Sequence, residues 1–214
     1  QGARLCREGG IDLIIAAGGG SVIDTAKVIA GSAAYEGDPW DLVKNRVQLT
    51  RALPLIAIPT MAATGSEMNS CAVITNPQTL EKYGWTTEPL RPKVSFLCPR
   101  NTYTVSPFQT ASGSADILSH LLEVYLNREE GFDSMDGFME SMMRSVIRWA
   151  PIAMAEGSNE EARANLLWDS EWAINDLIDR ATVWHGAATV WSTNCPPGTT
   201  FPTVWGWPSS HRLS

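Results

Sequence analysis

The stretch around residue 116 carries two side chains that could bind a metal ion. Asp116 and His120 are four positions apart, with Gly113 and Glu123 flanking them at three-residue spacing. Residues at i and i+4 share one face of an α-helix, so a carboxylate and an imidazole there can reach one divalent cation. The alternative is a surface Asp–His pair without a ligand. Two ligands do not complete a site, so other segments must supply the rest.

A glycine-rich turn near the start of the chain could bind phosphate. Residues 18–21 read Gly-Gly-Gly-Ser, and Asp24 and Lys27 follow at helical spacing. Glycine lets the backbone approach a ligand closely, and the first N–H groups of a following helix favour an anion. Ser21 adds a hydroxyl donor. The spacing matches neither the Walker A pattern nor G-x-G-x-x-G, so a simple tight turn is the alternative.

Hydroxyl and amide side chains cluster again in residues 59–69, which include Thr60, Thr64 and Asn69 and directly follow an apolar run. Ligands of open α/β sheets sit at the carboxyl ends of the strands. This loop and the glycine turn could therefore converge on one pyrophosphate. The alternative is that Thr64 or Ser66 caps a helix, and capping and ligand contact can coexist.

The apolar segments predict the elements that position these loops. A helix at residues 22–30 follows the glycine turn, and short buried strands of the parallel-sheet kind are expected at residues 11–17, 53–58 and 93–97. Strand, loop and helix alternate, which predicts an α/β first half.

From residue 107 onward the apolar spacing is helical. Amphipathic helices are expected at residues 111–127, 133–149 and 160–178, with Pro151 closing the second. Methionines on the second helix indicate core packing. The predicted fold is an α/β nucleotide-binding domain (1–106) followed by an all-α domain (107–180).

Composition narrows the class of protein. The 214 residues are 44% hydrophobic, which is enough for a sizeable core, and the formal net charge is −7, which disfavours a nucleic-acid partner. No apolar run is long enough to span a bilayer. The four cysteines are scattered without a C-x-x-C pair, which fits a reduced, cytoplasmic protein.

Together these motifs resemble the iron-containing (group III) alcohol dehydrogenases, in particular the branch of butanol dehydrogenase-like, NADPH-dependent aldehyde reductases. The resemblance spans roughly residues 11–179, and further matching motifs lie at residues 82–84, 161–166 and 172–175. It implies the dehydroquinate synthase-like fold of that family, with both domains incomplete. Cys98 departs from the family pattern, in which an Asp usually precedes the proline, and we expect only a local effect.

The resemblance also implies roles for individual residues. It places Gly19, Gly20 and Ser21 at the cofactor pyrophosphate, with Asp24 nearby. Positions that contact the cofactor in the family are matched by Thr60, Thr64, Asn69 and Lys82. Two of the family's metal ligands are matched by Asp116 and His120.

The implied reaction is reversible hydride transfer between NADP or NAD and a small primary alcohol or aldehyde, at a divalent metal that is iron or zinc. Relatives are commonly dimers, so a homodimer is one candidate state, although the sequence does not fix the oligomeric state; no nucleic-acid or membrane partner is expected. Two alternatives are a non-redox nucleotide-binding member of the same fold and a non-functional truncated product. A dehydroquinate synthase-like protein would lack the pattern at residues 60–69.

Residues 181–214 differ from the rest of the chain. They contain one charged side chain, Arg212, no acid, and four of the nine tryptophans. The resemblance calls for further histidine ligands here, yet only His185 and His211 follow His120. A shifted reading frame would explain this difference. If the third base of each codon is read with the first two bases of the next codon across residues 184–208, the genetic code permits the sequence His-x-Met-Glu-His-Glu-Leu and a later His-Gly.

At three codon junctions the shifted frame allows only one amino acid, and that amino acid matches the family. These are Leu at Asn194/Cys195, Gly at Trp205/Gly206 and Ala at Trp207/Pro208. We therefore interpret residues 181–214 as a frameshifted, non-native tail that begins near Arg180. A divergent interaction tail is the alternative. The family also has further strands before the glycine turn, so we expect the chain to be a fragment that is inactive as written.

Overall fold

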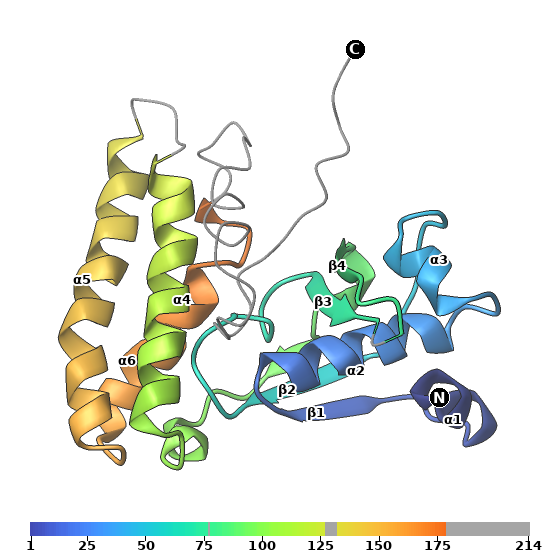
Figure 1. Ribbon diagram of the computed structural model, residues 1–214, viewed down its shortest axis with the longest axis horizontal. Coiled ribbons are helices and arrows are strands. Elements are labelled where there is room, and N and C mark those ends of the chain that lie inside the picture. Colours follow the sequence, from blue (N-terminus) through green and yellow to red (C-terminus); the bar gives the residue numbers. More distant parts are fainter. Residues whose placement is uncertain (77, 127–131, 179–214) are drawn as a thin grey trace.

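The computed structural model describes residues 1–76, 78–126 and 132–178 of the chain. A parallel sheet with its helices comes first, and three long helices follow and stand beside it (Figure 1). This arrangement confirms the predicted order of an α/β part and a helical part. The glycine turn lies in the first part and Asp116 in the second, so the fold must bring the two parts together at any shared site.

The sheet has three parallel strands in the order β1-β2-β5. β1 (Ile14–Gly18) pairs along its whole length with β2 (Leu55–Pro59), and β2 pairs with the short β5 (Val94–Ser95). α2 (Gly20–Ala33) covers one face, where a small core is formed by Ala16, Ile23, Ala26, Leu55 and Ala57. α1 (Gly2–Glu8) packs beside α2. All three predicted strands are confirmed, although β1 starts later and β5 is shorter than predicted.

The second face of the sheet is exposed within the described residues. The exposed fraction is 61% for Ile15, 46% for Val94 and 56% for Phe96, while Ala16 and Ala57 on the α2 side are buried. Successive side chains of a strand point to opposite faces, so the apolar run supplies both faces with apolar groups. The expectation that these strands are buried, as in most parallel sheets, therefore holds for one face only.

A two-stranded antiparallel hairpin lies beyond the sheet and was not predicted. It pairs β3 (Cys71–Thr75) with β4 (Lys82–Thr86). Trp85 of β4 is almost fully buried and belongs to a second apolar cluster with α3 (Pro39–Val43), the short 3₁₀ helix η1 (Glu88–Leu90) and Val28 of α2. The hairpin is thereby fixed against α2, and Lys82 of its second strand interacts electrostatically with Asp116 of the helical part.

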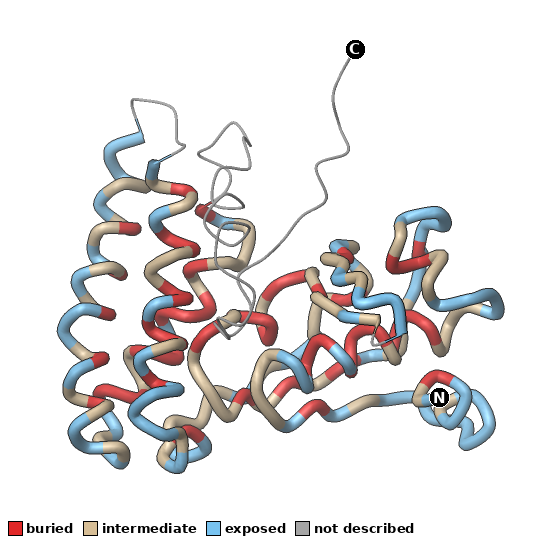
Figure 2. Tube along the Cα trace, viewed as in Figure 1, coloured by how far each residue is buried: buried red, intermediate tan, exposed pale blue. Residues whose placement is uncertain are grey.

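The helical part consists of α4 (Pro107–Leu126), α5 (Asp133–Ala155) and α6 (Glu160–Trp172), and the 3₁₀ helix η2 (Pro99–Thr102) leads into it. Buried residues of α5 lie on the side turned toward α4 (Figure 2). Met139 and Met142 are among them, which confirms that these methionines serve core packing. None of the described helices is apolar over a length that could cross a membrane.

Two predicted helix ends are wrong. α5 continues through Pro151 to Ala155, because this late position removes one backbone hydrogen bond while Ala150 and Ala153 stay buried on either side. α6 ends at Trp172 rather than at residue 178. Asp176 has a left-handed backbone (φ 70°) that no α-helix can continue.

Candidate functional site

The glycine turn leaves the start of α2 open. Gly19 caps the helix with an extended backbone, and its carbonyl accepts hydrogen bonds from the N–H groups of Val22 and Ile23. A Cβ atom at Gly19 would meet no atom of the described residues within 4 Å, so the backbone borders space that these residues leave open. The first N–H groups of a helix have no partner inside it, so this end of α2 can bind an anion.

The loop after β2 lies against the glycine turn. The N–H of Thr60 donates to the carbonyl of Gly18 at 3.0 Å, and a Cβ at Gly20 would overlap with the side chain of Thr64. The two loops that the sequence singled out are therefore in contact. The helix-cap alternative is wrong, because no helix begins between residues 60 and 70. Thr64 Oγ1 instead accepts from the N–H of Ser66 at 3.4 Å.

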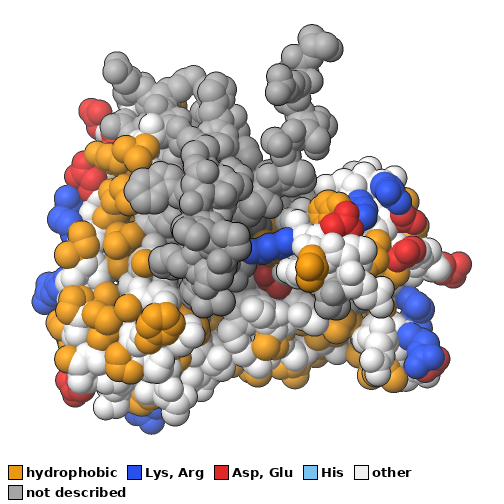
Figure 3. Space-filling model, in the orientation of Figure 1, with side chains coloured by type: hydrophobic (Ala, Val, Ile, Leu, Met, Phe, Trp, Pro, Cys, Tyr) orange, Lys and Arg blue, Asp and Glu red, His pale blue; other side chains and the backbone are white. Residues whose placement is uncertain are grey.

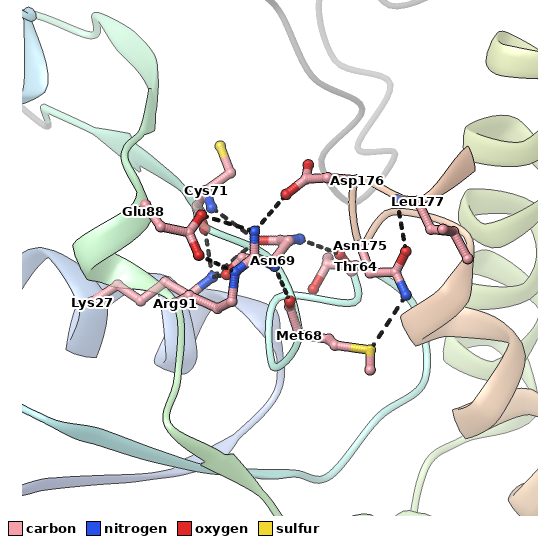
Figure 4. A network of polar contacts seen from close by, with 10 residues as sticks. All are labelled: Lys27, Thr64, Met68, Asn69, Cys71, Glu88, Arg91, Asn175, Asp176 and Leu177. Atoms are coloured by element: carbon pink, nitrogen blue, oxygen red, sulfur yellow. Dashed lines mark hydrogen bonds and ion pairs between the residues drawn. The ribbon is translucent and has the colours of Figure 1, made fainter. Parts of the chain in front are cut away.

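Two buried, charged side chains of α2 form hydrogen bonds with this loop and with the strand that follows it. Asp24 accepts hydrogen bonds from the Ser66 hydroxyl at 2.6 Å and from the N–H of Val73 at 3.0 Å. The Lys27 ammonium donates to the carbonyl and side-chain oxygens of Asn69, both at 2.9 Å, and to the carbonyl of Cys71 at 2.6 Å (Figure 4). Burial lowers the pKa of Lys27 to about 8, against the opposing charge of Asp24.

Asp24 and Asn69 were both predicted near the cofactor, and the structure shows how their polar atoms are used. Both carboxylate oxygens of Asp24 and the side-chain oxygen of Asn69 accept from protein donors. They are 8% and 2% exposed. These two residues therefore shape the loop.

The same loop touches the helical part at two places. A Cβ at Gly113 of α4 would overlap with the carbonyl oxygen of Ala62, so only glycine allows this approach. Gly65 has a positive φ of 54°, and a Cβ there would overlap with the carbonyl of Ser170 in α6. The loop from residue 60 to residue 71 therefore connects the start of α2 with α4, one turn before Asp116.

Asp116 and His120 lie together on the buried side of α4. Asp116 Oδ1 is 3.8 Å from His120 Nε2, and the side chains are 5% and 4% exposed. Asp116 Oδ1 and both ring nitrogens of His120 are buried and have no hydrogen-bond partner among the residues that the structure describes. Unpaired buried polar atoms are rare in proteins and call for a missing partner. A divalent cation would satisfy this carboxylate oxygen and imidazole nitrogen together.

Electrostatics give the imidazole the form that binds metals. Burial lowers the pKa of His120 to about 4, so the ring is neutral at pH 7. Burial raises the pKa of Asp116 to about 7, and only the nearby charge of Lys82 opposes this rise. Within residues 1–76, 78–126 and 132–178, no three His, Cys, Asp or Glu side chains are placed to share one ion. The described residues thus offer two side chains that could bind a metal ion, and further ligands would have to come from elsewhere.

Lys82, at the start of β4, links the two ends of the site electrostatically. Burial lowers its pKa, while the carboxylates of Asp116 and Asp24 act in the opposite direction. Its ammonium is therefore within reach of the charge on α2 and the charge on α4. A negatively charged ligand lying between the glycine turn and Asp116 would meet this cation.

Comparison with known proteins identifies the family. Residues 1–99 match the family model described as iron-containing alcohol dehydrogenase. Over 178 residues the chain is 48% identical to the NADH-dependent butanol dehydrogenase A of Clostridium acetobutylicum, covering 83% of this chain and 46% of that protein. The chain belongs to the iron-containing alcohol dehydrogenase family.

Two further relatives support this family assignment. The NADPH-dependent aldehyde reductase YqhD of Escherichia coli is 35% identical over 82% of this chain and 46% of its own length. The crystal structure of the NADH-dependent butanol dehydrogenase A of Thermotoga maritima superposes with a TM-score of 0.80 at 36% identity, over 84% of this chain and 45% of that one. The chain thus spans about half the length of these relatives.

Several residues that shape the candidate site of this family member were given no structural role from the sequence, although Lys27 was noted at helical spacing after the glycine turn. Lys27 is fully buried, and Glu67 and Glu171 are each 3% exposed where the loop meets α6. The position of Lys27 between apolar residues, on the face of α2 that packs inward, is the signal that indicates its burial. Glu67 and Glu171 left none, since their burial depends on contact between distant segments.

The free energy of unfolding should fall by roughly 3–5 kcal/mol between about pH 5 and pH 8 because of these two carboxyls, since a difference of one in pKa between the folded and the unfolded chain corresponds to about 1.4 kcal/mol. Burial raises the pKa of Glu67 to about 7 and that of Glu171 to about 7, and the charge of Glu67 adds to the second shift. Lys27 opposes the shift of Glu67 and Asp24 adds to it. The unfolded chain releases these protons near 4.5, so their contribution is full below that pH and is lost through pH 7.

Urea unfolding at several pH values tests this expectation. Glu67→Gln should flatten the decline, whereas Glu160→Gln, at an exposed position of α6, should leave it unchanged. Equal slopes in the wild type and Glu67→Gln would show that Glu67 is ionised in the folded protein at all of these pH values.

Proposed function

We propose that the chain forms the nucleotide-binding and part of the metal-binding portion of an NAD(P)-dependent alcohol dehydrogenase or aldehyde reductase. The observation that carries this is the unpaired, buried Asp116 and His120 beside a loop that also touches the glycine turn. A nucleotide phosphate and a metal ion would then both lie beside this loop. The relatives named for NADH- and NADPH-dependent activity support this combination.

In this proposal each residue has a distinct task. Gly19, Gly20 and Ser21 bind the pyrophosphate at the start of α2, with Thr60 and Thr64 beside them. Asp24 and Asn69 hold the loop in place. Lys82 balances the negative charge of the nucleotide between Asp24 and Asp116. When bound, iron or zinc at Asp116 and His120 supplies Lewis acidity toward an alcohol or aldehyde oxygen, and NAD(P)H supplies hydride.

We also propose that residues 1–106 form the nucleotide-binding domain and residues 107–180 the start of the metal-binding domain. The predicted frameshift from residue 181 lies outside the described residues, as do His185 and His211. Sequencing the gene around codons 178–184 tests it, because the shifted frame must spell the expected histidines. A reducing compartment such as the cytoplasm fits the free Cys6, Cys71 and Cys98, and a homodimer is proposed from the family alone.

Gly19→Val should weaken NADH or NADPH binding by about tenfold or more without unfolding the protein. Its Cβ would meet no atom of the described residues within 4 Å, so the added side chain would occupy the space proposed for the phosphates. Fluorescence titration of the 214-residue chain measures the affinity, and thermal unfolding reports the fold. Gly137→Val is the matched control, because a Cβ at Gly137 of α5 also meets nothing within 4 Å.

Failure of the wild-type chain to bind either nucleotide would refute the proposed nucleotide site, and so would equal affinities in wild type and Gly19→Val. Metal analysis of the protein read in the shifted frame is the second arm. It should retain a divalent ion, which Asp116→Asn should remove. Nucleotide binding without any metal would instead favour the non-redox alternative.

A further inference from the structure

Arg91 lies at a junction where three segments meet. It follows η1, and its side chain donates to three different partners (Figure 4). Its Nε and Nη2 donate to the carboxylate of Glu88 at 2.8 and 3.0 Å, and its Nη1 donates to the carbonyl of Met68 at 2.5 Å. Its Nη2 also donates to Asp176 Oδ2 at 2.6 Å. One guanidinium therefore joins the nucleotide part, the loop and the helical part.

Asp176 belongs to the segment that follows α6. Its backbone is left-handed (φ 70°), and the neighbouring Asn175 fixes this bend by accepting from the N–H of Leu177 at 3.0 Å. The amide of Asn175 also lies 3.5 Å from the sulfur of Met68. Met68 is thereby bound at its carbonyl by Arg91 and at its side chain by Asn175.

Met68 in turn precedes Asn69, which Lys27 binds from α2. The loop is therefore fixed to α2 on one side and to the segment after α6 on the other. The ion pairs of Arg91 are half-exposed, with side-chain exposures of 28% for Arg91 and 45% for Asp176. Such pairs add little stability. Their geometry is specific, however, because a guanidinium holds five N–H donors in one rigid plane, whereas an ammonium is a compact charge with three rotatable donors.

We propose that Arg91 is a positioning residue that sets how the nucleotide part and the helical part face each other. Through Met68 and Asp176 it holds the nicotinamide end of a bound cofactor toward Asp116 and His120. This inference rests on the proposed function. The adenine and pyrophosphate end, bound at the glycine turn, does not depend on this contact, so the two ends of the cofactor should respond differently to its loss.

The test compares NADH with ADP-ribose, which lacks the nicotinamide, in titrations of the 214-residue chain. Asp176→Asn keeps the shape of the side chain and suits a left-handed backbone. It should weaken NADH binding by about fivefold and leave ADP-ribose binding within about twofold. Arg91→Lys should do the same, and the double variant should be no weaker than either single one. Glu88→Gln, which leaves the contact with Asp176 intact, should change neither affinity.

The outcomes separate this inference from the proposed function. A wild-type chain that binds neither ligand refutes both. A wild-type chain that binds both ligands, with variants whose two affinities are unchanged or fall by the same factor, refutes only the role of Arg91. Thermal unfolding of each variant checks the fold, and Arg91→Lys provides the comparison if Asp176→Asn does not fold.

Discussion

Replacing Lys27 with methionine should lower the free energy of unfolding by about 3 kcal/mol. The methionine side chain fills a similar volume, but it cannot donate to the two oxygens of Asn69 or the carbonyl of Cys71 that the ammonium now binds. The carbonyl oxygens of Asn69 and Cys71 would lose this donor, the side-chain oxygen of Asn69 would keep only the N–H of Cys71, and Asp24 would lose its nearby positive charge. Chemical unfolding of the two proteins at pH 7 measures the difference.

Lys44→Met is the matched control for this substitution. Lys44 pairs with Glu81 at 3.3 Å, and the two side chains are 25% and 41% exposed. Its loss should lower stability by less than about 1 kcal/mol, because water can replace the lost partner. If Lys27→Met is as stable as Lys44→Met, the desolvation of the buried ammonium must cancel its hydrogen bonds, and the network does not stabilise the fold.

The loss of the Lys27 ammonium should also destabilise the loop at residues 60–71. The ammonium is the only described donor to the carbonyl of Asn69, and it fixes the end of the loop opposite Thr64. Amide hydrogen exchange across residues 60–71 should therefore accelerate more than exchange in α5. This pattern would link the stability effect to the site.

Local sequence patterns predicted those parts of the site that depend on neighbouring residues. The glycine turn follows a strand and opens a helix, and the four-residue spacing of Asp116 and His120 places both on one face of α4. The contact between the glycine turn and Thr64 also followed from the sequence, since parallel strands end at the same edge of a sheet. These inferences needed only strand and helix periodicity.

Local sequence patterns did not predict contacts between distant segments. The β3–β4 hairpin consists of two short strands, and its register depends on Trp85 packing against α2 and α3. Lys27 and Asp24 look like ordinary polar residues of an amphipathic helix until residues 66–73 cover them. Arg91 donates a hydrogen bond to Asp176, a residue that lies 85 positions later in the chain. Neither composition nor periodicity encodes such pairings.

The predicted helix ends are wrong for a related reason. Proline and the end of an apolar pattern are local signals for a helix C-terminus, yet α5 continues past Pro151 and α6 ends before its apolar pattern does. Burial of Ala153 keeps the last turn of α5 in place. The left-handed backbone at Asp176 ends any continuation of α6 and brings its carboxylate to Arg91. Tertiary contacts thus override the local signals.

Gly113→Ala and Gly137→Ala should change stability in opposite directions although both replace a glycine inside a helix. Alanine stabilises an open helical position by about 0.5–1 kcal/mol, because it has less conformational freedom to lose on folding. Gly137 of α5 is such a position, since a Cβ there meets nothing within 4 Å. Gly137→Ala should therefore raise the free energy of unfolding.

At Gly113 the same methyl group would overlap with the carbonyl oxygen of Ala62. That atom is backbone, so either the loop or α4 must move, and we expect a net loss of about 2 kcal/mol. Urea unfolding measures both variants, and NADH titration of Gly113→Ala should show weaker binding, because the loop that moves also carries Thr64. A Gly113→Ala protein more stable than wild type would show that α4 and the loop do not touch, and the proposed connection between the glycine turn and Asp116 would then fail with it.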